Sequence, residues 1–217
     1  MEKNTPTTEQ VEVSEDIISK ARANKKAIIW CSVVAFALII GVLVWMLVAQ
    51  AGSRNADELV ARADAATNDS VAAVLYTEAA NAGYKSGHRA AAQLAIMYYQ
   101  NGQYEQAIKC LDKADLDDKV AAAGVLSLKG DCYANLDKLD EALNCFNKAI
   151  SKADDNPEIV PMLLVKEANI YRAQENYAKE AECYKTIVDE YPSYSVETRT
   201  DIRKYYERAL AQSQQAN

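Results

Sequence analysis

The sequence predicts an all-α protein with two parts, a single apolar helix near the N-terminus and a series of stacked helical hairpins. Three observations support this fold class. An uncharged apolar run occupies residues 27–49. The remainder of the chain repeats a pattern of small and large apolar residues roughly every 35 positions. Only 7 glycines and 4 prolines occur in 217 residues, fewer than the many turns of a β-sandwich or barrel require.

The apolar run is long enough to cross a membrane. A helix over 27–49 would span roughly 34 Å, against a bilayer core of about 30 Å. Trp30 and Trp45 lie toward its two ends, where amphipathic rings favour the headgroup layer. A cleaved signal peptide is the alternative, because Ala49-Gln50-Ala51 resembles a cleavage site, but its apolar part is usually only ~7–15 residues long. The sequence therefore favours a transmembrane helix over 27–49.

Flanking charges predict the orientation of this helix. Lys20, Arg22, Lys25 and Lys26 precede it, whereas basic residues are sparse after it. The positive-inside rule therefore places a tail, residues 1–26, in the cytoplasm and residues 50–217 across the membrane. Charges in the tail cancel, so the net charge of -7 belongs to the translocated part. Such an acidic domain disfavours nucleic acid as a partner.

The translocated part contains a recurring unit. The stretch 88–114 shows it most completely, and related residues recur from Ala123 and from Pro161. Small residues would allow two antiparallel helices to approach, and larger ones would fill the layer between them. In 88–114 these positions are Leu94, Ala95, Tyr98, Gly102, Tyr104, Ala107, Leu111 and Ala114. This is the tetratricopeptide (TPR) pattern, and it predicts a TPR domain over 50–217 with units near 53–87, 88–122, 123–160 and 161–194, and a capping helix over 196–212.

Several local features refine this prediction. Asn55 resembles an N-cap that opens the first helix after the membrane. Asn156, followed by Pro157, predicts another helix start, and Ser195 is a candidate cap for the last helix. In the third full unit Glu180 stands where a small residue is expected, with Ala181 next to it. We interpret this displacement as a slipped or lengthened turn.

The cysteines admit two readings. Cys110, Cys132, Cys145 and Cys183 form an even set in an exported domain, which is compatible with disulfides. They also stand at repeating helical positions, where cysteine serves as a small buried apolar group. Because the chain has no C-x-x-C and no zinc-ligand spacing, we favour free buried thiols.

No catalytic motif is present. The sequence has no P-loop, G-x-S-x-G, H-E-x-x-H or G-x-G-x-x-G, so we expect neither an enzyme nor a cofactor site. The acidic segments 115–118 and 154–156 lack the spacing of a calcium loop and are interpreted as solvated loops rather than as a metal site. His88, the one histidine, is interpreted as a surface or packing residue.

Protein binding is the function that this pattern favours. In a TPR solenoid the first helix of each pair forms the inner surface, and certain of its positions face a bound partner. These positions hold an amphipathic mixture without a cluster of basic residues, unlike TPR domains that grip a C-terminal carboxylate. The candidates are Arg89, Ile96, Tyr99, Gln100, Asp131, Asn135, Asn169 and Arg172.

The arrangement of tail, single span and translocated TPR domain resembles the bacterial membrane-anchored TPR family that is named for an ancillary subunit of the SecYEG translocon. The segments 92–114, 126–149 and 163–192 carry the resemblance, in the style of Bacteroidetes members. It implies a single-pass protein of the bacterial inner membrane with a periplasmic domain. It also implies an adaptor that binds translocon subunits, periplasmic chaperones or exported chains, and assists the handover of exported proteins to chaperones.

Two other classes stay open. One is a periplasmic scaffold for cell division or envelope assembly, although such scaffolds usually add a coiled coil that this chain lacks. The other is an organellar import receptor whose TPR domain faces the cytosol. That receptor would need the opposite orientation, against the basic residues before the apolar run.

Overall fold

The computed structural model describes residues 25–215, and every regular element among them is a helix. Contacts divide the chain between Ala51 and Gly52 into two units, which are described separately. The all-α class predicted from the sequence is therefore confirmed for the described residues.

The first helix of the described residues, α2 (Lys25–Asp64), contains the apolar run. From Ile29 onward it is long and apolar enough to cross a membrane, as judged by length and composition alone. Its apolar side chains are largely exposed, including Trp30 at 69% and Trp45 at 70%. The prediction that Asn55 opens a new helix is wrong, because α2 continues through it to Asp64. The segment contains no proline to interrupt the helix, and Gly52 alone does not break it.

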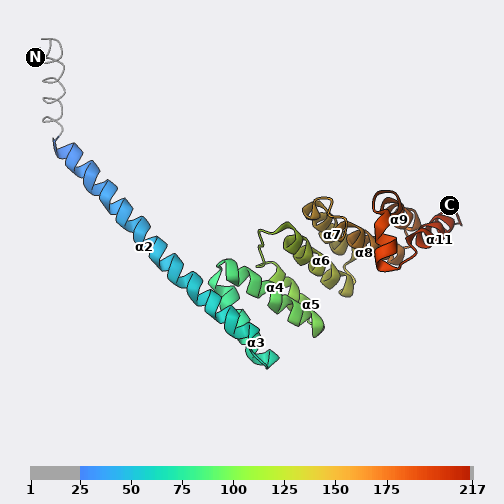
Figure 1. The fold of residues 1–217 in the computed structure, drawn as a ribbon, viewed down its shortest axis with the longest axis horizontal. Helices are drawn as coiled ribbons and strands as arrows, with labels where there is room; N and C mark the ends of the chain where they lie inside the picture. The colour runs from blue at the N-terminus through green and yellow to red at the C-terminus, as the bar shows by residue number, and fades with distance from the viewer. Residues whose placement is uncertain (1–24, 216–217) are drawn as a thin grey trace, which may run out of the picture. The chain divides into compact units, whose positions relative to one another are not determined.

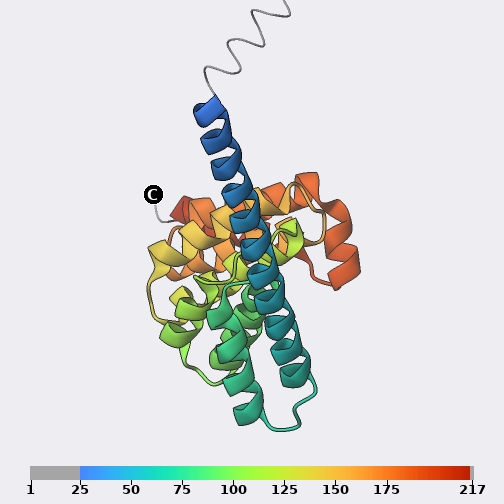
Figure 2. The same ribbon diagram turned by 90° about the vertical axis from the view of Figure 1, so that its left-hand side faces the viewer.

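The second of the two parts starts at Gly52 and contains all the helical hairpins, and we call it the repeat unit. It begins with the last turns of α2 and continues through nine further helices in the described chain (Figure 1). Neighbouring helices along the chain pack against each other from α3 to α9, and α11 packs on α9. The end of α2 runs antiparallel beside α3 (Figure 2) and shares a core with it through Leu59, Val60 and Tyr76. The helices are α3 (Asp69–Ala82), α4 (Lys85–Gln100), α5 (Tyr104–Leu111), α6 (Lys119–Asn135), α7 (Leu139–Ala153), α8 (Ile159–Ala173), α9 (Tyr177–Glu190), α10 (Pro192–Thr198) and α11 (Ile202–Gln215).

Three helical hairpins have the same turn. α4–α5, α6–α7 and α8–α9 are each joined by three residues, and the middle residue is left-handed, with φ of 71° at Gly102, 59° at Asp137 and 58° at Glu175. In each turn, the residue before the second helix donates its backbone N–H to the carbonyl of a tyrosine in the first. The N–O distances are 2.8, 2.9 and 2.8 Å, to Tyr98, Tyr133 and Tyr171 respectively. The predicted slip in the third unit is therefore wrong.

Because the turn has its usual length, Glu180 occupies the position at which the repeat pattern expects a small residue. Its side chain is fully buried, and Ala181 beside it is buried as well. The position accepts a glutamate because Arg208 of α11 reaches it with a hydrogen bond of 2.8 Å. The equivalent residues of the two preceding hairpins, Ala107 and Ala142, are both completely buried. The third hairpin thus keeps the geometry of the other two, although a glutamate replaces the alanine at this position.

Small residues set the approach of paired helices, as predicted. A Cβ added to Gly130 on α6 would lie 2.5 Å from Cε1 of Phe146 on α7. Phe146 is itself 1% exposed and belongs to the largest core cluster, which extends from α6 to α11. Any side chain at Gly130 would therefore have to displace this ring.

The chain after Pro192 differs from the prediction. Instead of one helix over 196–212, α10 ends where Arg199 adopts φ of 54°, and α11 begins at Ile202. Ser195 lies inside α10, and Asp201 instead accepts the backbone N–H of Lys204 at 3.1 Å. The physical reason is Pro192, which starts a helix directly after α9. Asn156 was predicted to cap α8, and its side-chain oxygen accepts from the N–H groups of residues 158 and 159. The helix itself begins later than predicted, at Ile159, with Glu158 at the N-cap position.

Candidate protein-binding surface

The eight predicted surface residues all lie on the first helices of the three regular hairpins. Four are on α4, two on α6 and two on α8. Arg89 and Ile96 are seven residues apart, or about two helical turns, and so share one side of α4. We call the surface of these eight residues, together with Lys166 described below, the inner face.

An ion pair links the inner face across two hairpins. Lys166 Nζ on α8 donates to Oδ1 of Asp131 on α6 at 2.6 Å, and it lies 5.7 Å from the centroid of the Phe146 ring. The lysine and aspartate side chains are 28% and 23% exposed, so water screens the pair less than it screens a surface pair. The pair fixes two neighbouring first helices relative to each other.

Sequence analysis did not identify Lys166, because it lies beside the positions that usually contact a partner. A signal was nevertheless present. Asp131 and Lys166 are 35 residues apart, close to the ~34-residue period of a TPR repeat. Opposite charges one period apart on the first helices would have pointed to contact between adjacent hairpins.

Tyr99 joins α4 to the same cluster. Tyr99 is half-buried, and burial raises the pKa of its hydroxyl, with a smaller contribution from the nearby negative charge of Asp131. Its ring meets that of Tyr104 edge-on, with 5.6 Å between centroids. Asn135 donates a hydrogen bond of 2.8 Å to the carbonyl of Asp131, one turn away. The structure therefore brings Tyr99, Asp131 and Asn135 together, as three of the eight predicted residues.

The other predicted residues are more scattered. On α8, Arg172 Nη2 donates to Oδ1 of Asn169 at 2.8 Å, which holds this arginine along its own helix. Ile96 is 38% exposed and Gln100 is exposed, and the Gln100 side chain makes no hydrogen bond to another described residue. Arg89 lies near the N-terminal end of α4, in the wall of a cavity.

The cysteines are not a reactive site. All five are free thiols, and Cys132, Cys145 and Cys183 are buried. Burial raises the pKa of Cys132 to about 11 and that of Cys183 to about 12, so neither forms a thiolate near neutral pH. Across residues 25–215, no group of three or more His, Cys, Asp or Glu side chains is placed to hold a metal ion.

Comparison with known proteins agrees with this repeat architecture. A family model described as "Anaphase-promoting complex, cyclosome, subunit 3", a TPR-like family, matches residues 57–149. This match covers less than half of the chain. Together with the three equivalent hairpins it supports a TPR-like fold for the described helices.

Solved structures of MamA are similar to this TPR protein at low identity. One crystal structure is 18% identical, with 68% of this chain and 90% of that chain covered and a TM-score of 0.48. A second is 17% identical, with 76% and 92% covered and a TM-score of 0.49. No curated protein sequence matches this chain significantly.

Proposed function

We propose that this TPR protein is a membrane-anchored periplasmic adaptor, which binds proteins near the Sec translocon and assists the handover of exported proteins to chaperones. The observation that supports it most is the inner face, where polar and aromatic groups from three successive hairpins lie on their first helices. A TPR fold is a scaffold for protein partners, and a surface that crosses several repeats suits an extended segment of such a partner.

The apolar helix supports the anchored part of the proposal. Its basic N-terminal flank supports an orientation in which the repeat unit lies on the far side of the membrane, which would be the periplasm in a bacterial inner membrane. Only residues 50 and 51 separate the apolar run from the repeat unit. A membrane-anchored repeat unit therefore stays close to the bilayer, where translocating chains emerge, and even weak contacts gain from the high local concentration.

Photocrosslinking in cells tests the proposal. A photoreactive amino acid replaces Tyr99 on the inner face or, in a matched control, Lys148, an exposed residue of α7. We expect the Tyr99 position to capture translocon subunits, periplasmic chaperones or exported chains, and the Lys148 position to capture few of them. Capture of division or envelope-assembly proteins at Tyr99 would replace the adaptor by the scaffold alternative. Equal capture at the two positions would contradict binding through the inner face.

A further inference from the structure

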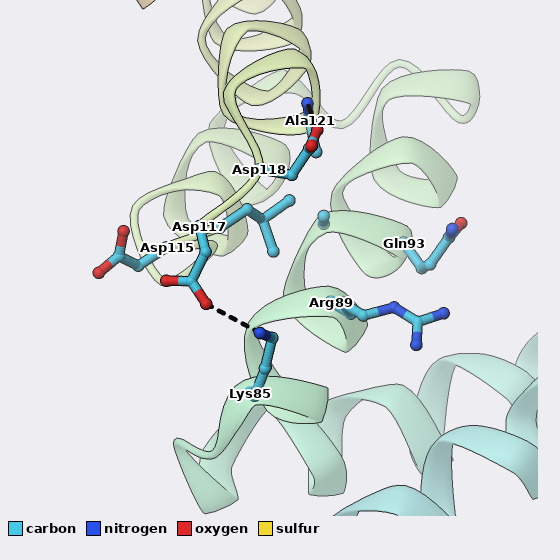
Figure 3. A pocket seen from close by; sticks show the side chains of 9 residues that line it. Lys85, Arg89, Gln93, Asp115, Asp117, Asp118 and Ala121 are labelled. Atoms are coloured by element: carbon cyan, nitrogen blue, oxygen red, sulfur yellow. Dashed lines mark hydrogen bonds and ion pairs between the residues drawn. The ribbon is translucent and has the colours of Figure 1, made fainter.

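A cavity of about 590 Å³ lies between the N-terminal half of α4 and the segment that leads into α6. Ala92, Leu116 and Ala121 give it an apolar lining. Arg89 and Gln93 of α4 also line it, one helical turn apart (Figure 3). The cavity thus combines space for an aliphatic side chain with two groups that donate hydrogen bonds.

Most of the other charges around the cavity are already occupied. Lys85 forms an ion pair of 2.9 Å with Asp117. Asp118 caps α6, because its Oδ1 accepts the backbone N–H of Ala121 at 2.8 Å. The Asp115 carboxylate lies on the opposite side of the view from Arg89 (Figure 3).

Arg89, by contrast, is free to bind a ligand. Its guanidinium is exposed and makes no hydrogen bond or ion pair with any residue in 25–215. An electrostatic neighbour of Arg89 is the hydroxyl of Tyr76, which itself donates a hydrogen bond to the carboxylate of Asp64. In Figure 3 the Arg89 and Gln93 side chains extend from α4 in the same direction. A guanidinium binds a carboxylate through two parallel hydrogen bonds, and a nearby amide adds a third donor.

We propose that this cavity holds an aliphatic side chain of a partner protein while Arg89 and Gln93 bind the carboxylate of an adjacent internal Asp or Glu. The proposal rests on the proposed function and adds the chemistry of the partner segment. The domain carries the net charge of -7, so most of its surface repels acidic segments and Arg89 provides a selective point of attachment. The exposed Ile96 and Gln100 farther along α4 offer contacts to a chain that continues past the carboxylate, which favours an internal residue over a chain end.

Fluorescence anisotropy with defined peptides tests this assignment. The full chain in detergent micelles is titrated into a fluorescein-labelled, C-terminally amidated peptide, Gly-Ser-Leu-Glu-Leu-Ser-Gly. Two comparison peptides carry Gln instead of Glu, one amidated and one with a free C-terminal carboxylate. We expect the Glu peptide to bind roughly tenfold more tightly than either Gln peptide, the preference that a charge-assisted carboxylate contact provides.

Variants assign the preference to the cavity. Arg89→Gln should reduce the affinity for the Glu peptide to that for the Gln peptide. Arg203→Gln removes the same charge from exposed α11 and should leave the tenfold preference in place. The proposal would be overturned if the three peptides bind equally or not at all, or if the peptide with the free C-terminus binds best. Equal losses of affinity in the two variants would overturn it as well. None of these outcomes affects capture at Tyr99, so failure here is distinguishable from failure of the adaptor function.

Discussion

Arg208 of α11 donates a hydrogen bond of 2.8 Å from Nη2 to Oε1 of Glu180 on α9, and the glutamate side chain is completely buried. The second oxygen of Glu180 has no hydrogen-bond partner among the described residues. The adjacent rings of Tyr184 and Tyr205 stack with 5.7 Å between centroids. This contact attaches the last helix to the last regular hairpin.

Removing the arginine should destabilise the C-terminal end. In Arg208→Met the carboxylate of Glu180 stays buried without its partner, and we expect a loss of about 2–3 kcal/mol, below the range for fully buried pairs because Arg208 is 38% exposed. Adding Glu180→Ala restores the small residue that Ala107 and Ala142 provide, and should recover most of that loss. Thermal melting followed by circular dichroism measures both variants. A double variant as unstable as Arg208→Met would refute this account.

Stability should fall between about pH 4.5 and 7 because of Glu167. This side chain of α8 is 5% exposed, its Oε1 has no hydrogen-bond partner in residues 25–215, and burial raises its pKa to about 7. The unfolded chain releases this proton at lower pH, near 4.5, so raising the pH through this window favours unfolding. The shift limits the effect to about 3 kcal/mol.

Glu167→Gln should remove this pH dependence. We expect the variant to be more stable than the wild type at pH 8 and no more stable at pH 4, as measured by melting temperature. Glu182→Gln changes an exposed acid of neighbouring α9 and serves as the control. A wild type whose stability rises steadily from pH 5 to pH 8, with Glu167→Gln parallel to it, would contradict the assignment.

Two glycines of α6 should respond in opposite ways to the same substitution. Gly130→Ala places a methyl group against the Phe146 ring and should cost about 1–3 kcal/mol through overpacking. Gly124 is exposed, and a Cβ there meets no atom within 4 Å. Gly124→Ala should therefore stabilise the protein by up to about 1 kcal/mol, because alanine favours the helix. Denaturant unfolding of the two variants tests this, and equal effects would show that the assigned packing of α6 on α7 is wrong.

Reporter fusions test the predicted orientation of the apolar helix. Alkaline phosphatase joined after Asn217 should be active in intact bacteria, because the basic residues before the helix retain the N-terminus in the cytoplasm. A cytoplasmic reporter at the same point should be inactive. The reverse pattern of activity would place the repeat unit in the cytosol and favour the import-receptor class.

Periodic packing made most of the fold predictable. Residues such as Gly130 and Ala107 have to be small because two helices approach there, and the regular spacing of such residues can be recognised from a single sequence. Helix ends were less predictable, because Asn55 and Ser195 have good capping side chains, and a competing helix formed over each of them. A cap residue stabilises a helix start by only about 0.5–2 kcal/mol, which neighbouring segments readily outweigh.

The surface was predictable only in part. The repeat pattern places Tyr99, Asp131 and Asn135 on the first helices, and the 35-residue separation of Asp131 and Lys166 is the sequence signal of their ion pair. The side chain that replaces the small residue at Glu180 depends on α11, which lies outside the repeat pattern. Interactions between a repeat and a non-repeating segment have no periodic signal, so a structure was needed to find them.

The four cysteines of the repeat helices, three buried and Cys110 partly buried, can be used to measure local opening of the solenoid. Cys110, Cys132, Cys145 and Cys183 lie on four helices, α5, α6, α7 and α9. Because burial raises the pKa of each, each is less reactive while its helix stays packed than after that helix separates from its neighbours. Pulsed thiol labelling, read by mass spectrometry, would therefore give a local opening rate for successive hairpins from the unmodified sequence. A partner that holds neighbouring hairpins together would slow the labelling of the cysteines beneath it.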